Sequence, residues 1–281
     1  MKNFKICLCT IGKKENLYAL EFVNHYKNLG YNHIFIYDNN DINDERFEEV
    51  IDKHIKTNYV SIINFRGFIG RRGENPHFYA YYDCYKKNNK IYKWLSFFDF
   101  DEYLRFKTPN ETIQNFLYKK RFNKCICIKI NWLMYSDNNL LYYQNKSLNQ
   151  RFLTPIYDDP RNNVIKSTVR GNLKINYWEN MRNPHTTSNN DYISCSSSGK
   201  IVKSTDFFVI PPDFELAFLN HYATKTIEEY CLKLKRGWAD IKFQLNNQTL
   251  KEKFDYFFLK NKKTKEKLLY FKNMFNITFQ P

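Results

Sequence analysis

The sequence lacks the features that mark several common classes of protein. It contains no stretch of 18 or more apolar residues free of charge, so no transmembrane helix is predicted. It contains neither GxGxxG nor GxxxxGK[ST], which argues against a nicotinamide-dependent enzyme and a P-loop enzyme. Without such a loop, a bound nucleotide needs side chains and a metal to neutralise its phosphates.

The chain has no CxxC pair, so its seven cysteines do not form a familiar zinc pattern. Cys7 and Cys9, like Cys125 and Cys127, have the i, i+2 spacing of a strand inside apolar runs. These patterns indicate buried, reduced thiols in a cytosolic protein. The first residues have neither the length nor the small-residue cleavage site of a signal peptide, and we expect them to form a strand.

The sequence has many more basic than acidic residues. The 281 residues carry a formal net charge of +15, with 43% hydrophobic and 18% aromatic residues. The composition predicts a folded protein, and the charge suggests a nucleic acid, an acidic membrane surface or a phosphorylated substrate as partner. A solvated lysine-rich surface is the alternative. Residues 251–281 hold eight Lys and three acidic residues among apolar ones, a pattern for a membrane-surface helix or a docked C-terminal helix.

The first hundred residues alternate between strand and helix patterns. Residues 4–11, 33–37, 59–65 and 93–100 are predicted strands, and 15–29 and 76–87 are predicted helices. Gly30 is placed to end the first helix, whose predicted apolar side comprises Leu17, Leu20, Phe22, Val23, Tyr26 and Leu29. This order predicts parallel pairing, with ligands bound beyond the carboxyl ends of the strands.

The rest of the chain has a less regular pattern. Residues 125–133 are a predicted strand, and residues 226–238 a helix that Thr226 caps. We therefore expect a first domain over residues 1–225, with one half at about 1–105 and another at about 106–225. Residues 226–281 would form a basic helical segment.

The strongest chemical signal is WLSFFDFDEYLR, at residues 94–105. Asp99 and Asp101 follow a core-type strand, and i, i+2 spacing would put them on one face. Two such carboxylates suit a hard divalent cation that also holds a diphosphate. Chance alone gives about one Asp-x-Asp in a chain with this many Asp, so a capped turn after the strand is the plain alternative.

Several segments together resemble GT-A glycosyltransferases related to families 2 and 92. The opening strand, helix and IYDN strand end resemble the start of those enzymes, and WLSFFDFDEYL resembles their metal motif. NWLMYSDNNLLYY with QRF, VIKSTVR and LNHYATKTIEEYCLKLKRGWAD resemble three further elements of family 92, in the same order. The resemblance covers roughly residues 4–240. It implies that residues 1–225 are a GT-A catalytic domain, with a nucleotide-sugar half at about 1–105 and an acceptor half at about 106–225. Ser136-Asp137 departs from the Gly-Ser of the family.

The resemblance implies an α/β fold with a GT-A-type, Rossmann-like, mostly parallel sheet flanked by helices, followed by a helical C-terminal segment. It also implies an inverting, metal-dependent transfer of a sugar from a nucleotide-diphosphate donor, expected to be a UDP-sugar. Asp99 and Asp101 would hold Mn²⁺ or Mg²⁺, and His221 matches a late metal ligand. Galactose as the sugar, and a role in surface polysaccharide or lipopolysaccharide synthesis, are expected by analogy with the family.

Further residues are candidates for binding the donor or the acceptor. Arg71 and Arg72 could meet a diphosphate bidentately or be plain surface charge. Helix capping is the alternative for Thr10 and Glu15, and core packing is the alternative for the two aromatic residues. The candidates for the nucleotide-sugar pocket are Thr10, Glu15, Asp38, Asn39, Arg71 and Asp99, and those for stacking on the acceptor are Trp132 and Tyr135.

Inversion requires a general base that takes the proton of the acceptor hydroxyl. Asp137 is the leading candidate because it follows the strand next in order after the metal strand. Glu179 and Asp191 are the main alternatives, and Asp158 and Glu215 are further carboxylates after the metal motif.

Two other functions compete with glycosyl transfer. A nuclease-like, metal-dependent enzyme would explain the charge and the carboxylate pair, but the basic residues are dispersed and no nucleic-acid-binding motif occurs. A carbohydrate-binding module would not need Asp99 and Asp101. We therefore expect a glycan or lipid-linked glycan acceptor and no nucleic-acid partner. The expected location is the cytoplasm, with peripheral binding to the anionic inner face of the membrane.

Overall fold

The computed structural model describes residues 4–69, 75–173, 193–203, 207–237 and 247–276. Its N-terminal part is the alternating unit that the sequence predicts. Parallel pairing joins β3 to β2, β2 to β1 and β1 to β4. The elements of this part are β1 (Ile6–Gly12), α1 (Asn16–Asn28), β2 (His33–Asp38), α2 (Glu48–Lys56), β3 (Val60–Asn64), α3 (Pro76–Asn88) and β4 (Trp94–Phe97).

The following strands extend the sheet with mixed pairing. The strand order is β10-β9-β6-β8-β4-β1-β2-β3, and β11 pairs with β5 and β6. Because β8 runs antiparallel to both β4 and β6, the prediction of a mostly parallel sheet holds only for the N-terminal part. The elements of this region are β5 (Glu102–Phe106), α4 (Ile113–Leu117), η1 (Lys120–Phe122), β6 (Cys127–Tyr135), α5 (Leu148–Arg151), β7 (Pro155–Ile156), η2 (Pro160–Asn163), β8 (Ile165–Arg170), β9 (Ser194–Ser196), β10 (Ile201–Val202) and β11 (Ala217–His221).

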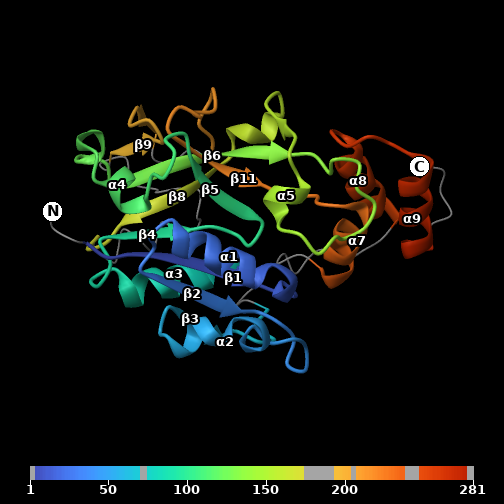
Figure 1. The fold of residues 1–281 in the computed structure, drawn as a ribbon, viewed down its shortest axis with the longest axis horizontal. Helices are drawn as coiled ribbons and strands as arrows, with labels where there is room; N and C mark the ends of the chain where they lie inside the picture. The colour runs from blue at the N-terminus through green and yellow to red at the C-terminus, as the bar shows by residue number, and fades with distance from the viewer. Residues whose placement is uncertain (1–3, 70–74, 174–192, 204–206, 238–246, 277–281) are drawn as a thin grey trace.

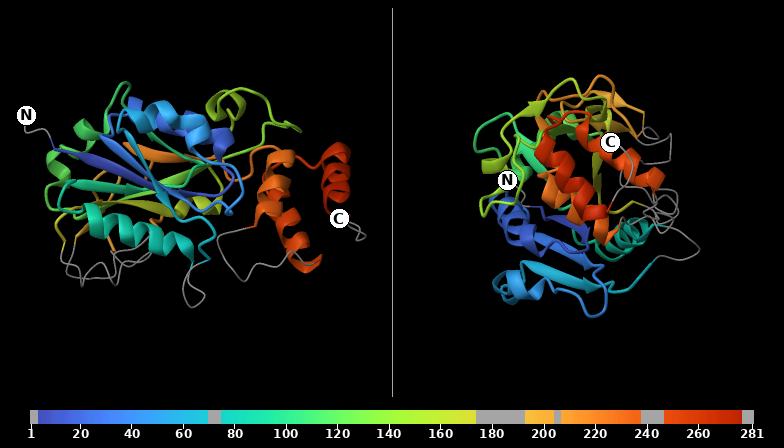
Figure 2. Two further views of the ribbon diagram at one scale, coloured as in Figure 1. Left: turned by 90° about the horizontal axis from the view of Figure 1, so that it is seen from below. Right: turned by 90° about the vertical axis from the view of Figure 1, so that its right-hand side faces the viewer.

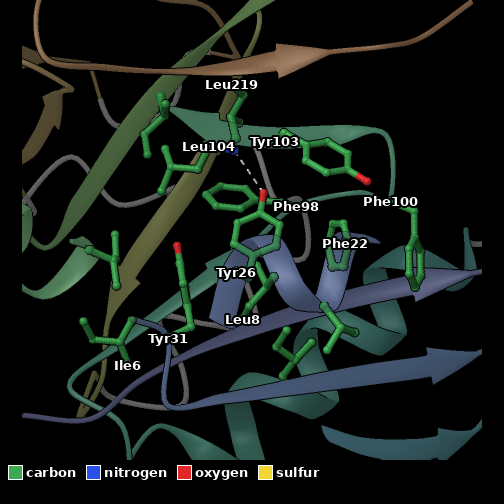
Figure 3. Close-up of a cluster of buried hydrophobic side chains, with 14 of the residues drawn as sticks. Ile6, Leu8, Phe22, Tyr26, Tyr31, Phe98, Phe100, Tyr103, Leu104 and Leu219 are labelled. Carbon is green, nitrogen blue, oxygen red and sulfur yellow. Dashed lines mark hydrogen bonds between the residues drawn. The ribbon is translucent and has the colours of Figure 1, made fainter. Parts of the chain in front are cut away.

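Helix α1 covers the sheet with an aromatic face. Phe22 and Tyr26 are fully buried, and the Tyr26 hydroxyl receives a hydrogen bond from the Leu104 amide at 3.2 Å (Figure 3). Gly30 ends this helix region with φ +88°, as predicted. Leu17 and Leu20 were predicted on the apolar side but are 52% and 47% exposed. The helix buries Tyr18, Ala19, Phe22, Val23 and Tyr26 instead, because these residues face the sheet.

The cysteines are only partly as predicted. Cys7, Cys9, Cys84, Cys127 and Cys231 are free and buried. Cys125 and Cys195 form a disulfide, so the prediction of seven reduced thiols is wrong for these two. The sequence did not indicate this pair because its members are 70 residues apart. The sheet topology brings them together, since β9 pairs with β6 directly after Cys125.

Three helices lie together at one end of the sheet (Figures 1 and 2). They are α7 (Ile227–Arg236), α8 (Asn247–Phe258) and α9 (Lys265–Phe275). Thr226 caps α7 in a capping box with Glu229, which confirms the predicted helix start. Phe254, Phe257 and Phe271 pack in a core shared by the three helices. Within the described ranges, no helix is both long enough and apolar enough to cross a membrane.

Candidate functional site

A cavity of about 460 Å³ opens where the sheet meets α7. Its floor comes from the end of β1 and the turn between β4 and β5, as expected for ligands beyond the carboxyl ends of parallel strands. The lining includes Gly12, Lys13, Glu15, Asn39, His77, Asp99, Asp101, Trp132, His221, Tyr230, Lys233 and Arg236. The cavity therefore combines carboxylates, imidazoles, cations and aromatic rings from segments that lie far apart in the sequence.

Asp99 lies in the turn after β4, where three side chains hold it. Lys166 of β8 donates to Oδ2 at 2.7 Å, and the Tyr81 hydroxyl donates to Oδ1 at 2.8 Å. His77 Nε2 is 3.8 Å from Oδ1. Although burial disfavours the charged form, the Lys166 ammonium holds the pKa of the Asp99 carboxyl well below its usual range. Asp99 is therefore a carboxylate with one face toward the cavity.

Asp101 is held by a different set of residues. Lys233 of α7 donates to Oδ2 at 2.7 Å, and His221 Nε2 is 3.6 Å from Oδ1. Burial opposes ionisation here too, but Lys233 and His221 hold the pKa of Asp101 well below its usual value. The two carboxylates both line the cavity, as the motif suggests. They lie in a turn rather than on the strand itself.

Glu102 provides a third carboxylate, next to Asp101 in the sequence. Glu102 is fully buried, and its Oε2 accepts the Asp99 amide at 3.0 Å. Burial raises its pKa well above the usual value. One ligand atom each from Asp101, Glu102 and His221 lies within 4.8 Å of the other two. Two oxygens and an imidazole nitrogen form a donor set that Mn²⁺ accepts, so these residues fit a divalent cation. Asp99 is outside this trio.

The carboxylate turn packs tightly against the end of β1. A Cβ added at Gly12 would lie 2.5 Å from the Phe100 ring, so only glycine fits there without displacing that ring. Phe100, between the two aspartates in sequence, stacks on Phe47 with centroids 5.3 Å apart. The aromatic core thus fixes the turn that presents Asp99 and Asp101.

Arg236 connects α7 to the loop after β1. Its guanidinium donates to the Lys13 carbonyl at 2.6 Å and pairs with Glu15 Oε1 at 2.6 Å. Lys14 in this loop has φ +54°, and its amide donates to the Asn40 side chain at 2.6 Å. A cation from the C-terminal helices therefore holds the backbone at the predicted nucleotide pocket.

Some predicted pocket residues line the cavity and others do not. Glu15 and Asn39 line it. Thr10 is fully buried within β1, and Asp38 pairs with Arg66 at 2.7 Å. Neither belongs to the cavity lining. Arg71 and Arg72 lie outside the described residues.

The two predicted acceptor residues have different surroundings. Trp132 lines the cavity, with its ring centroid 4.2 Å from that of His221. Tyr135 packs against Tyr222 with centroids 5.0 Å apart and is not part of the lining, in keeping with the core-packing alternative. Trp132 is thus the aromatic side chain next to the carboxylate site.

Asp137 is enclosed away from the cavity lining. It is 1% exposed and pairs with Lys267 of α9 at 2.5 Å. Its amide also donates to the Asn261 side chain at 2.8 Å. These contacts are those of a structural ion pair between β6 and the C-terminal helices. The other base candidates, Glu179 and Asp191, lie outside the described residues.

No single sequence motif predicts the three cations at the site. Lys166, Lys233 and Arg236 pair with Asp99, Asp101 and Glu15 across 67, 132 and about 220 residues. All three occur in the stretches VIKSTVR and LKLKRGWAD, which carried only a family resemblance. Spacing could not reveal the pairing, because it depends on the tertiary arrangement of β8 and α7.

The fold and the cavity are those of an α/β enzyme with a carboxylate-rich site. The chain belongs to glycosyltransferase family 92, whose pattern matches residues 2–267. It is therefore a glycosyltransferase, which leaves the nuclease-like alternative without support. A search among curated proteins finds no match.

Solved structures provide distant likenesses. S. aureus TarS 1–349 matches at a TM-score of 0.40 and 10% identity, over 90% of this chain and 70% of that one. TarS 1–349 in complex with UDP-GlcNAc matches at 0.35 and 13%, over 50% and 37%. The glycosyltransferase GlyE of Streptococcus pneumoniae TIGR4 matches at 0.29 and 12%, over 64% and 37%. The chain spans 23% of the length of a longer TarS structure.

Proposed function

We propose that this enzyme is an inverting, metal-dependent GT-A-type hexosyltransferase that moves a sugar from a UDP-sugar to a glycan acceptor. The observation that carries the proposal is the meeting of Asp99, Asp101 and His221 with Lys233 and Arg236 around one cavity. Carboxylates that can hold a cation, next to two cations that can meet phosphate, suit a nucleoside diphosphate. Galactose as the sugar and a role in surface glycan synthesis follow from the family resemblance alone.

The residues that fit the ion are Asp101, Glu102 and His221, with Asp99 beside them. A bound Mn²⁺ or Mg²⁺ would supply charge stabilisation to the departing diphosphate. Lys233 and Arg236 would bind the phosphates from the side of α7. Trp132, which lines the cavity beside His221, offers an apolar ring face to a sugar.

The general base is the least constrained role. Because Asp137 is enclosed with Lys267, we propose that Glu179 or Asp191 takes the proton of the acceptor hydroxyl. Glu179→Gln and Asp191→Asn should each be assayed for transfer and for donor binding. The base variant should lower turnover by about a hundredfold or more while nucleotide affinity stays the same.

The test of the function is a donor screen with purified protein. Hydrolysis and transfer would be measured across a panel of UDP-sugars and other nucleotide sugars, with Mn²⁺, Mg²⁺ or EDTA. We expect turnover of a UDP-hexose that EDTA abolishes and Mn²⁺ restores. Full activity in EDTA would contradict the metal-dependent proposal, and preference for another nucleotide would contradict the donor.

We also propose a cytoplasmic enzyme that binds peripherally to the inner face of the membrane. Phe254, Phe257 and Phe271 of α8 and α9 face the core of these helices, and Lys262 and Lys263 are exposed in the turn between the two helices. Leu259 and Leu269 are 65% and 54% exposed beside those lysines. A basic surface with apolar side chains supports contact with anionic lipid.

A further inference from the structure

A second hollow adjoins the catalytic cavity between α1 and α7. This α1–α7 groove has a volume of about 440 Å³. Glu15, Lys233 and Arg236 line both the groove and the catalytic cavity, so the ion pair of Glu15 with Arg236 lies between the two. The groove is thus a neighbouring compartment with its own lining.

Lys225 is the unusual residue of this groove. It is 5% exposed, and in the described part of the chain it has no hydrogen bond or ion pair. Its Nζ lies 4.3 Å from the centroid of the Tyr18 ring. Burial lowers its pKa. An ammonium group with little access to water and without a partner is costly, which indicates that an anion belongs beside it.

Three carboxylates near Lys225 already pair with other cations, and a fourth, Glu45, accepts the Asn16 amide at 2.9 Å. Glu229 receives two hydrogen bonds from Arg151, at 2.7 and 2.9 Å, and one from the Tyr18 hydroxyl at 2.6 Å. Glu15 pairs with Arg236, and Asp101 pairs with Lys233. Matching these pairs leaves one buried positive charge, on Lys225.

The walls of the groove are apolar at the rim. Leu17 of α1 and Leu232 of α7 each expose 52% of their surface, although each belongs to a helix with a buried face. Lys14 and Lys235 also line the groove. A buried cation with two exposed leucines beside it suits a ligand that carries both an anionic group and an apolar chain.

We propose that the α1–α7 groove binds the phosphate of an amphipathic acceptor, with Lys225 on the phosphate and Leu17 and Leu232 on the adjoining alkyl chain. This inference rests on the proposed function, since it places the acceptor's sugar across the Glu15–Arg236 pair in the catalytic cavity. A phosphate is favoured over a carboxylate because Lys235 lines the groove together with Lys225, and a phosphate monoester can carry a second negative charge toward it.

The test uses octyl phosphate, inorganic phosphate and octyl glucoside as probes of the full chain without nucleotide or metal. Binding would be measured by calorimetry and by the shift in melting temperature. We expect octyl phosphate to bind at least about tenfold more tightly than either of the other probes. Equal binding of octyl glucoside, or of inorganic phosphate, would overturn the proposed ligand class.

Three variants locate the site. Lys225→Met keeps an unbranched side chain at φ +53° and should lose at least about tenfold in affinity for octyl phosphate. Leu232→Gln changes a half-exposed residue of the groove wall. This variant should bind inorganic phosphate like the wild type, but it should bind octyl phosphate no more tightly than inorganic phosphate. Lys90→Met, at an exposed position after α3, should bind octyl phosphate like the wild type.

The melting temperature of unliganded Lys225→Met should equal or exceed that of the wild type, because the variant removes an unpaired buried charge. Unchanged octyl phosphate binding in Lys225→Met and Leu232→Gln would overturn the proposal. Since no donor is present, failure here leaves UDP-sugar transfer untouched. Intact binding without transfer would count only against the proposed function.

Discussion

Two groups of aspartate–lysine pairs differ in their surroundings: the aspartates of one group line the catalytic cavity, and the aspartate of the other is enclosed. In the turn after β4, Asp99 pairs with Lys166 and Asp101 with Lys233, both at 2.7 Å. Between β6 and α9, Asp137 pairs with Lys267 at 2.5 Å. The Asp99 side chain is 30% exposed, whereas that of Asp137 is 2% exposed.

This difference separates a reactive arrangement from a structural one. A cation or phosphate that enters the cavity can exchange partners with Asp99, Asp101 and Lys233. Nothing can enter between Asp137 and Lys267 without opening the packing of α9. The same pair of residue types is therefore accessible to a ligand in one region and holds a helix in place in the other.

The largest effect should come from neutralising the cavity pair. Asp99→Asn and Asp101→Asn should each lower transfer by about a thousandfold or more, because charge stabilisation at the diphosphate is worth several kcal/mol. Both variants should remain folded by circular dichroism. Asp255→Asn, at an exposed position on α8, is the matched control. Near-normal transfer in either cavity variant would show that the substituted carboxylate has no role in the reaction.

Breaking the enclosed pair should instead affect stability. Asp137→Asn leaves the Lys267 ammonium buried without its partner, and we expect a loss of about 3 kcal/mol in the free energy of unfolding. Urea denaturation of the purified variant would measure it. The double variant Asp137→Asn with Lys267→Met should recover much of that loss. A stable Asp137→Asn protein with a hundredfold lower turnover would restore Asp137 as a base candidate.

A smaller effect concerns pH and the core under α1. Burial lowers the pKa of His25 to about 3, below that of an unfolded histidine. The unfolded chain then binds a proton between pH 6.5 and 3 that the folded chain does not, so stability is full above this window and falls as pH decreases. His25 should contribute a loss of about 2 kcal/mol between pH 7 and pH 5.

Urea unfolding at both pH values would measure that loss for the wild type and for His25→Gln. Glutamine can retain the hydrogen bond to the Leu104 carbonyl, which His25 Nε2 makes at 3.0 Å. The variant should therefore lose less stability between pH 7 and pH 5. Protonation of the other histidines should still account for part of the decrease in the free energy of unfolding. An identical decrease in the free energy of unfolding in the two proteins would contradict the assignment to His25.

The smallest expected effect is the binding of α8 and α9 to a membrane surface. Vesicle co-sedimentation should show weak, salt-sensitive binding to anionic lipid, of about 1 kcal/mol or less for each lysine near the surface. Lys251→Glu with Lys262→Glu should reduce it, since both lysines are exposed. Binding that persists at high salt, or that does not depend on anionic lipid, would contradict this role.

The sequence predicted local elements well where one periodicity dominated. The strands at 4–11 and 33–37, the helix at 76–87 and the capped helix after Thr226 all appear with small shifts in their ends. Leu17 and Leu20 were misplaced because a wide apolar stripe does not say which part of it the sheet will cover. Their exposure is a consequence of how α1 sits on β1 and β2.

By itself, the sequence determined that strand and helix alternate, that Gly30 ends the first helix, and that a carboxylate pair follows a buried strand. These features depend on neighbouring residues, so local steric and hydrophobic patterns suffice to predict them. Only the tertiary structure decided that Lys166, Lys233 and Arg236 meet the carboxylates, that Cys125 bonds Cys195, and that Asp137 is enclosed. Each of these depends on contacts between distant segments, and such contacts form only when β8, β9, α7 and α9 dock on the sheet.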